Sequence, residues 1–161
     1  MHIASSVHFC FDVWPPSEVI LTKYTLACTI LLVVSHGHKY KYMQLPPEEI
    51  AVKWFDAFNT HNLDNLLALY HDEAIHYSPK LKIRQPETDG LIKGRKALYN
   101  WWQDAFERLP QLHYRPTTYT ANAERVFMEY VRSVPGEADM LVAEVLEIKD
   151  GKIVASRVYH G

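Results

Sequence analysis

The last fifty residues of the chain alternate apolar and polar side chains, and this pattern constrains the fold more than any other feature. A period of two residues is typical of strands that bury one face. Asp150 and Gly151 stand between the last two segments, and this dipeptide is a strong signal for a β-hairpin turn. We therefore expect an antiparallel sheet of consecutive strands. The alternating segments are 112–121, 125–134, 140–149 and 152–160.

The residues before this region follow a helical period instead. Two prolines and two glutamates at 46–49 suit the first turn of a helix, and Ile50, Trp54 and Phe58 then recur every four residues. Pro79 stops a strand that begins at Ala74. The expected elements are a helix from 47 to about 59, a short helix from 62 to 70, a strand at 74–78, a polar loop over 80–94 and a third helix over 95–109.

Helices followed by a run of antiparallel strands indicate the α+β class, in which helices pack on one face of a curved sheet. We expect three N-terminal helices packed on a curved antiparallel sheet. A strongly bent sheet that helices cover leaves a concavity between the two layers, and this is the default place for a ligand.

Residues 1–42 differ from the rest of the chain. They hold both cysteines and an apolar run, Tyr24 to Val34, which is shorter than the ~20 residues of a comfortable membrane span. Three interpretations stay open: an extension outside the working protein, a weak membrane anchor, or an element packed on the domain. We predict an N-terminal extension over 1–42 and one domain over 43–161, with membrane contact only if the extension is an anchor.

The charge of the chain excludes one class of function. The formal net charge is −2, and no basic block follows residue 43, so nothing favours nucleic-acid binding. Cys10 and Cys28 have no cysteine downstream with which to pair, which is compatible with a reducing compartment. We expect a cytoplasmic protein.

Three stretches of the chain resemble the nuclear transport factor 2-like superfamily, especially its SnoaL-like and ketosteroid-isomerase-like branches. The resemblance covers residues 45–161 and implies a cone-shaped α+β barrel. The same cone hosts isomerases, polyketide cyclases, dehydratases, epoxide hydrolases and proteins without chemistry, so function has to be argued from the site. The stretches are "WFDAFNTHNLDNLLALYHDEAIHYSP" (54–79), "GLIKGRKALYNWW" (90–102) and "VAEVLEIKDGKIVASRVYHG" (142–161).

The ketosteroid isomerase site is largely absent. The resemblance places Ser78, before Pro79, where these enzymes have the aspartate that moves the proton, and a serine needs an activating neighbour to act as a base. Trp54 stands at the position of the oxyanion-binding tyrosine and offers only an N–H donor. Glu144 corresponds to the second acid. We therefore do not expect steroid isomerisation.

The resemblance implies that Ser78 faces the cavity, and a period of two residues puts His76 on the same face. The same alternation along the later strands predicts an apolar and aromatic wall that a few polar groups interrupt, as a small-molecule pocket requires. The predicted substrate-binding residues are Trp54, Phe58, Ser78, Trp102, Met128, Tyr130, Val158 and His160.

Glu144 and His76 are the predicted catalytic residues. Glu144 interrupts an apolar strand face, where an ionised carboxylate is costly unless its pKa rises or a cation pairs with it. An imidazole titrates near neutral pH, so His76 could be its acid/base partner. The alternative is that Glu144 is paired structurally with Arg132, His160 or His76. No local spacing of ligands supports a metal site, and we expect neither a metal nor a cofactor.

Two functions follow from this pattern. The first is binding of a small apolar organic molecule with cofactor-free acid/base catalysis of the isomerase, cyclase or dehydratase type. The alternative is a non-catalytic ligand-binding or dimerisation module whose pocket polar groups are structural. The outer face of the sheet has an apolar centre, so we expect a homodimer through this face. Its residues are Phe127, Val131, Val145 and Tyr159.

Overall fold

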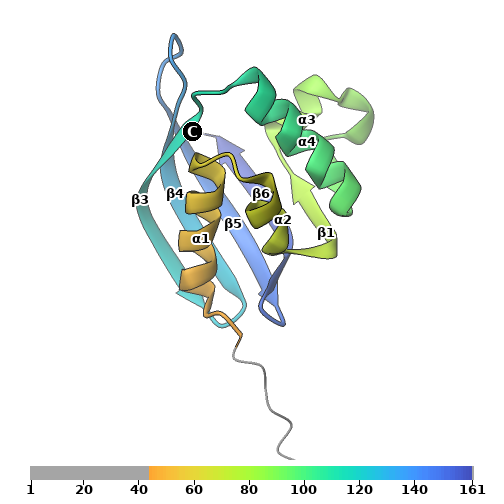
Figure 1. Ribbon diagram of the computed structural model, residues 1–161, viewed down its shortest axis with the longest axis vertical. Coiled ribbons are helices and arrows are strands. Elements are labelled where there is room, and N and C mark those ends of the chain that lie inside the picture. The colour runs from red at the N-terminus through yellow and green to blue at the C-terminus, as the bar shows by residue number, and fades with distance from the viewer. Residues whose placement is uncertain (1–43, 161) are drawn as a thin grey trace, which may run out of the picture. The chain divides into compact units, whose positions relative to one another are not determined.

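The computed structural model describes residues 44–160 (Figure 1). The predicted extension over residues 1–42 lies outside this range. The elements, in chain order, are α1 (Pro47–Asn59), α2 (Leu63–Ala68), β1 (Tyr70–Tyr77), α3 (Pro79–Arg84), the 3₁₀ helix η1 (Pro86–Thr88), β2 (Leu91–Lys93), α4 (Arg95–Arg108), β3 (His113–Asn122), β4 (Arg125–Ser133), β5 (Met140–Lys149) and β6 (Lys152–His160).

The described strands form one six-stranded sheet in the order β2-β1-β6-β5-β4-β3. Helices α1 and α2 lie over one face of it, and α3 and α4 lie near β1 (Figure 1). The α+β class and the helices over a sheet are therefore confirmed. The sheet is open, because β2 and β3 are its two edges and do not pair with each other.

The direction of one strand pair differs from the prediction. Strands β3 to β6 are antiparallel to their neighbours, as the alternation predicts, but β1 runs parallel to β6, with His76 opposite Ser156. The prediction of an antiparallel sheet is wrong for this pair. The reason is that β1 and β6 come from opposite ends of the domain, so no hairpin turn fixes their relative direction. This pairing places β1, the first strand in the sequence, next to β6, the last one.

Helix α1 forms where the sequence predicts it. Pro47 occupies the first turn, where its missing N–H costs nothing, and Glu48 and Glu49 lie near the positive end of the helix dipole. The apolar residues repeat with a helical period, and they pack against β3 and β4. The buried residues of α1 are Ile50, Ala51, Trp54, Phe55, Ala57 and Phe58.

The segment 80–94 is not the predicted loop, because it contains α3, η1 and β2. Ser78 is the N-cap of α3: its side chain accepts a hydrogen bond from the Lys80 backbone N–H at 3.3 Å, and Pro79 follows in the first turn. A serine followed by proline is a helix-start signal that the sequence carries. The prediction of a loop relied on the polar composition of the segment and did not use this helix-start signal. Helix α3 is important because it carries Lys80 and Arg84 to the cavity described below.

Gly90 joins η1 to β2 in a conformation that a side chain would disturb. Its φ is +86°, and an added Cβ would lie 2.9 Å from Tyr77 Cε2 and 3.2 Å from the Ser78 carbonyl oxygen. Gly136 has almost the same φ, +85°, but nothing lies within 4 Å of its Cβ position.

We therefore expect Gly90→Ala to destabilise the domain more than Gly136→Ala does. The positive φ alone costs about 1–2 kcal/mol for an alanine, and the crowding at Gly90 adds about 1–3 kcal/mol. Urea unfolding of both variants measures the difference. Equal losses of unfolding free energy would contradict the close packing of α3 and η1 against β1.

The outer face of the sheet carries the apolar residues on which the predicted homodimer depends. Phe127 is 41% exposed and Tyr159 is 49% exposed, while Val131 and Val145 are half-buried. The homodimer stays a prediction.

Candidate functional site

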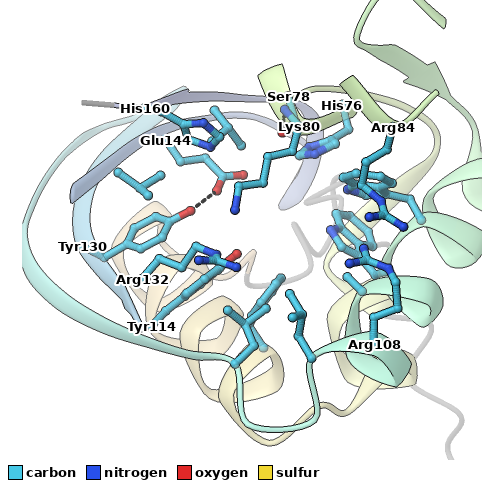
Figure 2. A pocket seen from close by; sticks show the side chains of 18 of the residues that line it. His76, Ser78, Lys80, Arg84, Arg108, Tyr114, Tyr130, Arg132, Glu144 and His160 are labelled. Carbon is cyan, nitrogen blue, oxygen red and sulfur yellow. Dashed lines mark hydrogen bonds between the residues drawn. The ribbon is translucent and has the colours of Figure 1, made fainter. Parts of the chain in front are cut away.

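A cavity of about 350 Å³ lies between the inner face of the sheet and helices α1, α3 and α4 (Figure 2). A volume of this size holds a small organic molecule. The cavity brings together side chains from eight elements spread along the domain. Among the predicted site residues, those that line it are Trp54, Phe58, His76, Ser78, Trp102, Tyr130, Glu144, Val158 and His160.

Met128 is the predicted site residue that does not line the cavity. Its side chain is fully buried, at 0% exposure, in the apolar core. Met128 points to the same side of β4 as Tyr130, as the period of two requires. It lies one pleat further along β4, among the buried apolar residues of the core. Met128 therefore belongs to the core and does not line the cavity.

Glu144 is buried in the wall of the cavity, with 2% of its surface exposed. The Tyr130 hydroxyl donates a hydrogen bond to Glu144 Oε2 at 2.9 Å, while Oε1 has no hydrogen-bond partner among the described residues (Figure 2). Burial raises the pKa of the Glu144 carboxyl from 4.5 to about 7, and the Tyr130 hydrogen bond opposes part of this rise. Glu144 is therefore an acid that changes its protonation state near neutral pH.

The structural pairing considered for Glu144 is not observed. Arg132 Nη1 lies 2.7 Å from Glu137 Oε2, so this guanidinium is paired with another acid. His76 Nδ1 lies 2.7 Å from Ser156 Oγ. Within residues 44–160, the partner of the Glu144 carboxyl is the Tyr130 hydroxyl.

Tyr130 is positioned by the pairing of β4 with β5. Met128 lies opposite Glu144 and Tyr130 opposite Val142, so Tyr130 and Glu144 are diagonal neighbours on the inner face. Burial, and then the nearby Glu144 charge, hold the pKa of the Tyr130 hydroxyl well above its ordinary value. Tyr130 consequently remains a donor whether Glu144 is ionised or neutral.

His76 is held by a chain of hydrogen bonds that the sequence did not reveal. Trp54 Nε1 donates to the Tyr70 hydroxyl at 3.0 Å, and the Tyr70 hydroxyl donates to Ser156 Oγ at 3.5 Å. His76 Nδ1 lies 2.7 Å from Ser156 Oγ, and in the tautomer with an unprotonated Nδ1 the Ser156 hydroxyl donates to it. The proton of the neutral imidazole is then on Nε2.

Burial lowers the pKa of His76 to about 4. A histidine with this pKa is neutral at physiological pH, so the expectation that His76 titrates as an acid/base partner near neutral pH is not supported. In the tautomer protonated on Nε2, this N–H is a hydrogen-bond donor at the cavity that His76 lines. Alternation along the last strand predicts Ser156 on the inner face, but its contact with His76 depends on the parallel pairing of β1 with β6.

Trp54 contributes its ring to the cavity and not its N–H, which is donated to Tyr70. The Trp54 and Phe58 rings are stacked with centroids 5.1 Å apart, and Phe58 stacks on Tyr114 at 4.2 Å. These three rings give the wall a flat apolar surface. Ser78 Oγ accepts from the Lys80 backbone N–H, and within residues 44–160 its hydroxyl proton has no acceptor, so it can donate to a ligand.

Positive side chains also line the cavity, and the sequence predicted only one of them to face inward. Arg132 follows from the alternation of β4, but Lys80 and Arg84 lie on α3, and Arg108 lies on the last turn of α4. Burial, and then the charges of Lys80 and Arg132, lower the pKa of His160. His160 is therefore close to this positive group.

Residues 44–160 contain no group of three or more His, Cys, Asp or Glu side chains with the geometry to hold a metal ion. No helix in the same range combines the length and the apolar character that crossing a membrane requires.

The structure is an α+β domain with a cavity between its sheet and its helices. Comparison of the sequence with known protein families identifies the family. Residues 51–156 match the SnoaL-like domain. The chain therefore belongs to the SnoaL-like family, and the resemblance found in the sequence is confirmed. No curated protein matches the chain.

Solved structures show the same fold. A SnoaL-like protein of unknown function from Burkholderia thailandensis is 25% identical, with a TM-score of 0.65 over 71% of this chain and 93% of that one. A candidate polyketide cyclase from Sinorhizobium meliloti is 20% identical, with a TM-score of 0.59 over 71% and 95% of the two chains. A candidate ketosteroid isomerase from Kribbella flavida is 18% identical, with a TM-score of 0.58 over 70% and 76%. At these identities the last two structures bear on the fold alone.

Proposed function

We propose that the cavity binds a small, mostly apolar organic molecule and that Glu144 exchanges a proton with it without a cofactor. The observation that carries this proposal is the Glu144 carboxyl itself. One of its oxygens is buried at the cavity wall without a hydrogen-bond partner among the described residues, and its pKa is about 7. A carboxyl kept in this state costs stability, and a pKa near 7 suits a general base or acid at neutral pH.

The proposed reaction is proton transfer next to a carbonyl group. Ionised Glu144 removes a proton from a carbon beside the carbonyl, the C–H bond breaks, and an O–H bond forms on the carboxyl. The electron pair moves to the carbonyl oxygen and gives an enolate, to which the His76 Nε2–H and the Ser78 hydroxyl donate. In a β,γ-unsaturated ketone the enolate is conjugated with the C=C bond, and return of the proton to the γ carbon completes an isomerisation. Tyr130 holds Oε2 throughout and leaves Oε1 to carry the proton.

The alternative is a module that binds a ligand without chemistry, and one observation favours it. Glu144 is only 2% exposed, and a base must be reachable by its substrate. Access depends on the side chains in front of it. Lys80 is half-buried, and its flexible side chain extends into the cavity toward Glu144 (Figure 2). A ligand reaches the carboxyl only when the side chains that cover it move.

Hydrogen–deuterium exchange of a ketone separates the two functions. We expect the full chain to accelerate exchange of the acidic C–H protons of 2-tetralone, a flat ketone of suitable size, in D₂O. Loss of their ¹H NMR signal measures the rate. The rate should increase with pH through an apparent pKa near that of Glu144, about 7. If 2-tetralone and a series of cyclic ketones and β-keto esters bind but exchange no faster than with Glu144→Gln, the catalytic proposal fails and the binding module remains.

A further inference from the structure

The cavity is positively charged at its wall, although the chain as a whole has a net charge of −2. Lys80, Arg84, Arg108 and Arg132 all line it. Two acidic residues form ion pairs with three of these cations. Glu137 pairs with Arg132 at 2.7 Å, and Asp104 lies 2.8 Å from Arg108 Nε and 3.8 Å from Arg84 Nη2. When Glu144 is neutral, the acids within residues 44–160 that pair with these cations leave two positive charges at the cavity unbalanced.

Arg132 is the most deeply placed of these cations. Its residue is 4% exposed, so the guanidinium is almost completely removed from bulk water. One of its five N–H donors goes to Glu137, and among the described residues no other hydrogen bond of this side chain is recorded. The other Arg132 nitrogens are not among the enclosed atoms that lack a partner, so their donors are open to a ligand in the cavity that Arg132 lines.

Lys80 lies beside Arg132. Burial, and then the positive charge of Arg132, lower the pKa of the Lys80 amine, and Arg108 adds to this effect while Glu137 opposes it. The Lys80 side chain reaches into the cavity from α3, and Arg132 reaches it from β4 (Figure 2). Within residues 44–160, Lys80 forms no ion pair, whereas its neighbour Lys82 pairs with Asp89 at 2.6 Å on the surface. Two like charges therefore face one space.

We propose that the ligand of this cavity is an organic anion: an aromatic carboxylate whose charge is held by Lys80 and Arg132 while its ring packs on Trp54, Phe58 and Tyr114. This inference rests on the proposed function, because it names the substrate class of the same site. A carboxylate matches the paired N–H donors of a guanidinium. The stacked rings offer the flat apolar surface that an aromatic body requires.

The anion is also compatible with the acid at the site. With Glu144 ionised, as the proposed reaction requires, the four cations that line the cavity balance the charges of Glu137, Asp104, Glu144 and one ligand carboxylate. Arg84 and Arg108 share Asp104, so they are secondary contacts.

A pair of ligands that differ in charge tests the inference. The probes are 2-naphthoate and 2-naphthamide, which share the ring system, and isothermal titration calorimetry on the full chain at low salt measures both affinities. We expect 2-naphthoate to bind about 10- to 100-fold more tightly than 2-naphthamide, as a charge-assisted hydrogen bond predicts. Lys80→Met should remove most of this preference without weakening 2-naphthamide. Lys82→Met, on the same helix but outside the cavity, should leave both affinities unchanged.

Arg132→Met is a second variant, for which the same loss of preference is expected once circular dichroism confirms that it folds. Equal binding of the two probes by the wild-type chain would overturn the anion inference but leave the proposed function standing. An equal loss of affinity for both probes in Lys80→Met would also overturn it, because Lys80 would then contribute packing and not charge. If neither probe binds to the wild-type chain, the inference and the ligand cavity of the proposed function fail together.

Discussion

Glu144→Gln is expected to lower the rate of ketone proton exchange by about 10²–10⁴-fold, the usual contribution of a positioned general base. The amide has the shape of the carboxyl and can still accept the Tyr130 hydrogen bond, so the cavity keeps its form. What it loses is the ability to take a proton. The rate of 2-tetralone deuteration, followed by ¹H NMR at pH 8, measures the effect.

Two further variants define the origin of this loss. Glu129→Gln removes a carboxyl from the neighbour of Tyr130 on the opposite face of β4 and should leave the rate unchanged. Tyr130→Phe removes the donor that opposes the rise of the Glu144 pKa, so the pH midpoint of the rate should move upward. If Glu144→Gln retains the wild-type rate on a ketone that it still binds, Glu144 is not the base.

Glu144→Gln is also expected to make the protein more stable than the wild type at high pH. The pKa of Glu144 is about 7 in the folded chain, against 4.5 for an ordinary glutamate. Between these two values the unfolded chain has released the proton that the folded chain still binds, so the free energy of unfolding decreases as the pH rises. At 1.36 kcal/mol per pKa unit the wild-type chain loses about 3 kcal/mol between pH 4 and pH 8 from this group. Glu144→Gln does not have this loss.

The measurement is the difference in unfolding free energy between Glu144→Gln and the wild type, from urea unfolding at several pH values. The difference should grow by about 3 kcal/mol in favour of the variant from pH 4 to pH 8, with most of the change between 4.5 and 7. Comparing the two chains is essential, because His76 acts in the opposite direction. Its pKa is lowered to about 4, so His76 costs stability as the pH falls below 6.5. A difference that does not vary with pH would contradict the raised pKa of Glu144.

The sequence predicts the strands β3 to β6 and the helices α1 and α4 because their signals are local. A period of two or of 3.6 residues is visible within one segment, and so is the Asp150–Gly151 turn. The parallel pairing of β1 with β6 has no such signal, because it joins the two ends of the domain.

The residues of the candidate site are likewise predictable where their signal is local and not where it depends on long-range pairing. Glu144 and His76 are predictable, since alternation fixes the face of the strand on which each side chain lies. The distance along a strand is not fixed by alternation, and for this reason Met128 was assigned to the cavity although it lies in the core. The contact of Ser156 with His76 depends on the β1–β6 pairing, and the position of Lys80 depends on α3. Neither the parallel pairing nor this helix is predicted from the sequence.

The pKa of the Glu144 carboxyl is the quantity on which the account depends most directly. The chain labelled with ¹³C at the glutamate side-chain carboxyl, titrated by NMR, gives this value, and the signal absent from Glu144→Gln assigns it. The structure predicts a midpoint of about 7, and a shift of this midpoint when 2-tetralone binds in the cavity. A midpoint near 4.5 that the ligand does not change would mean that the carboxyl is hydrated and ordinary, and the proposed proton transfer would have no base.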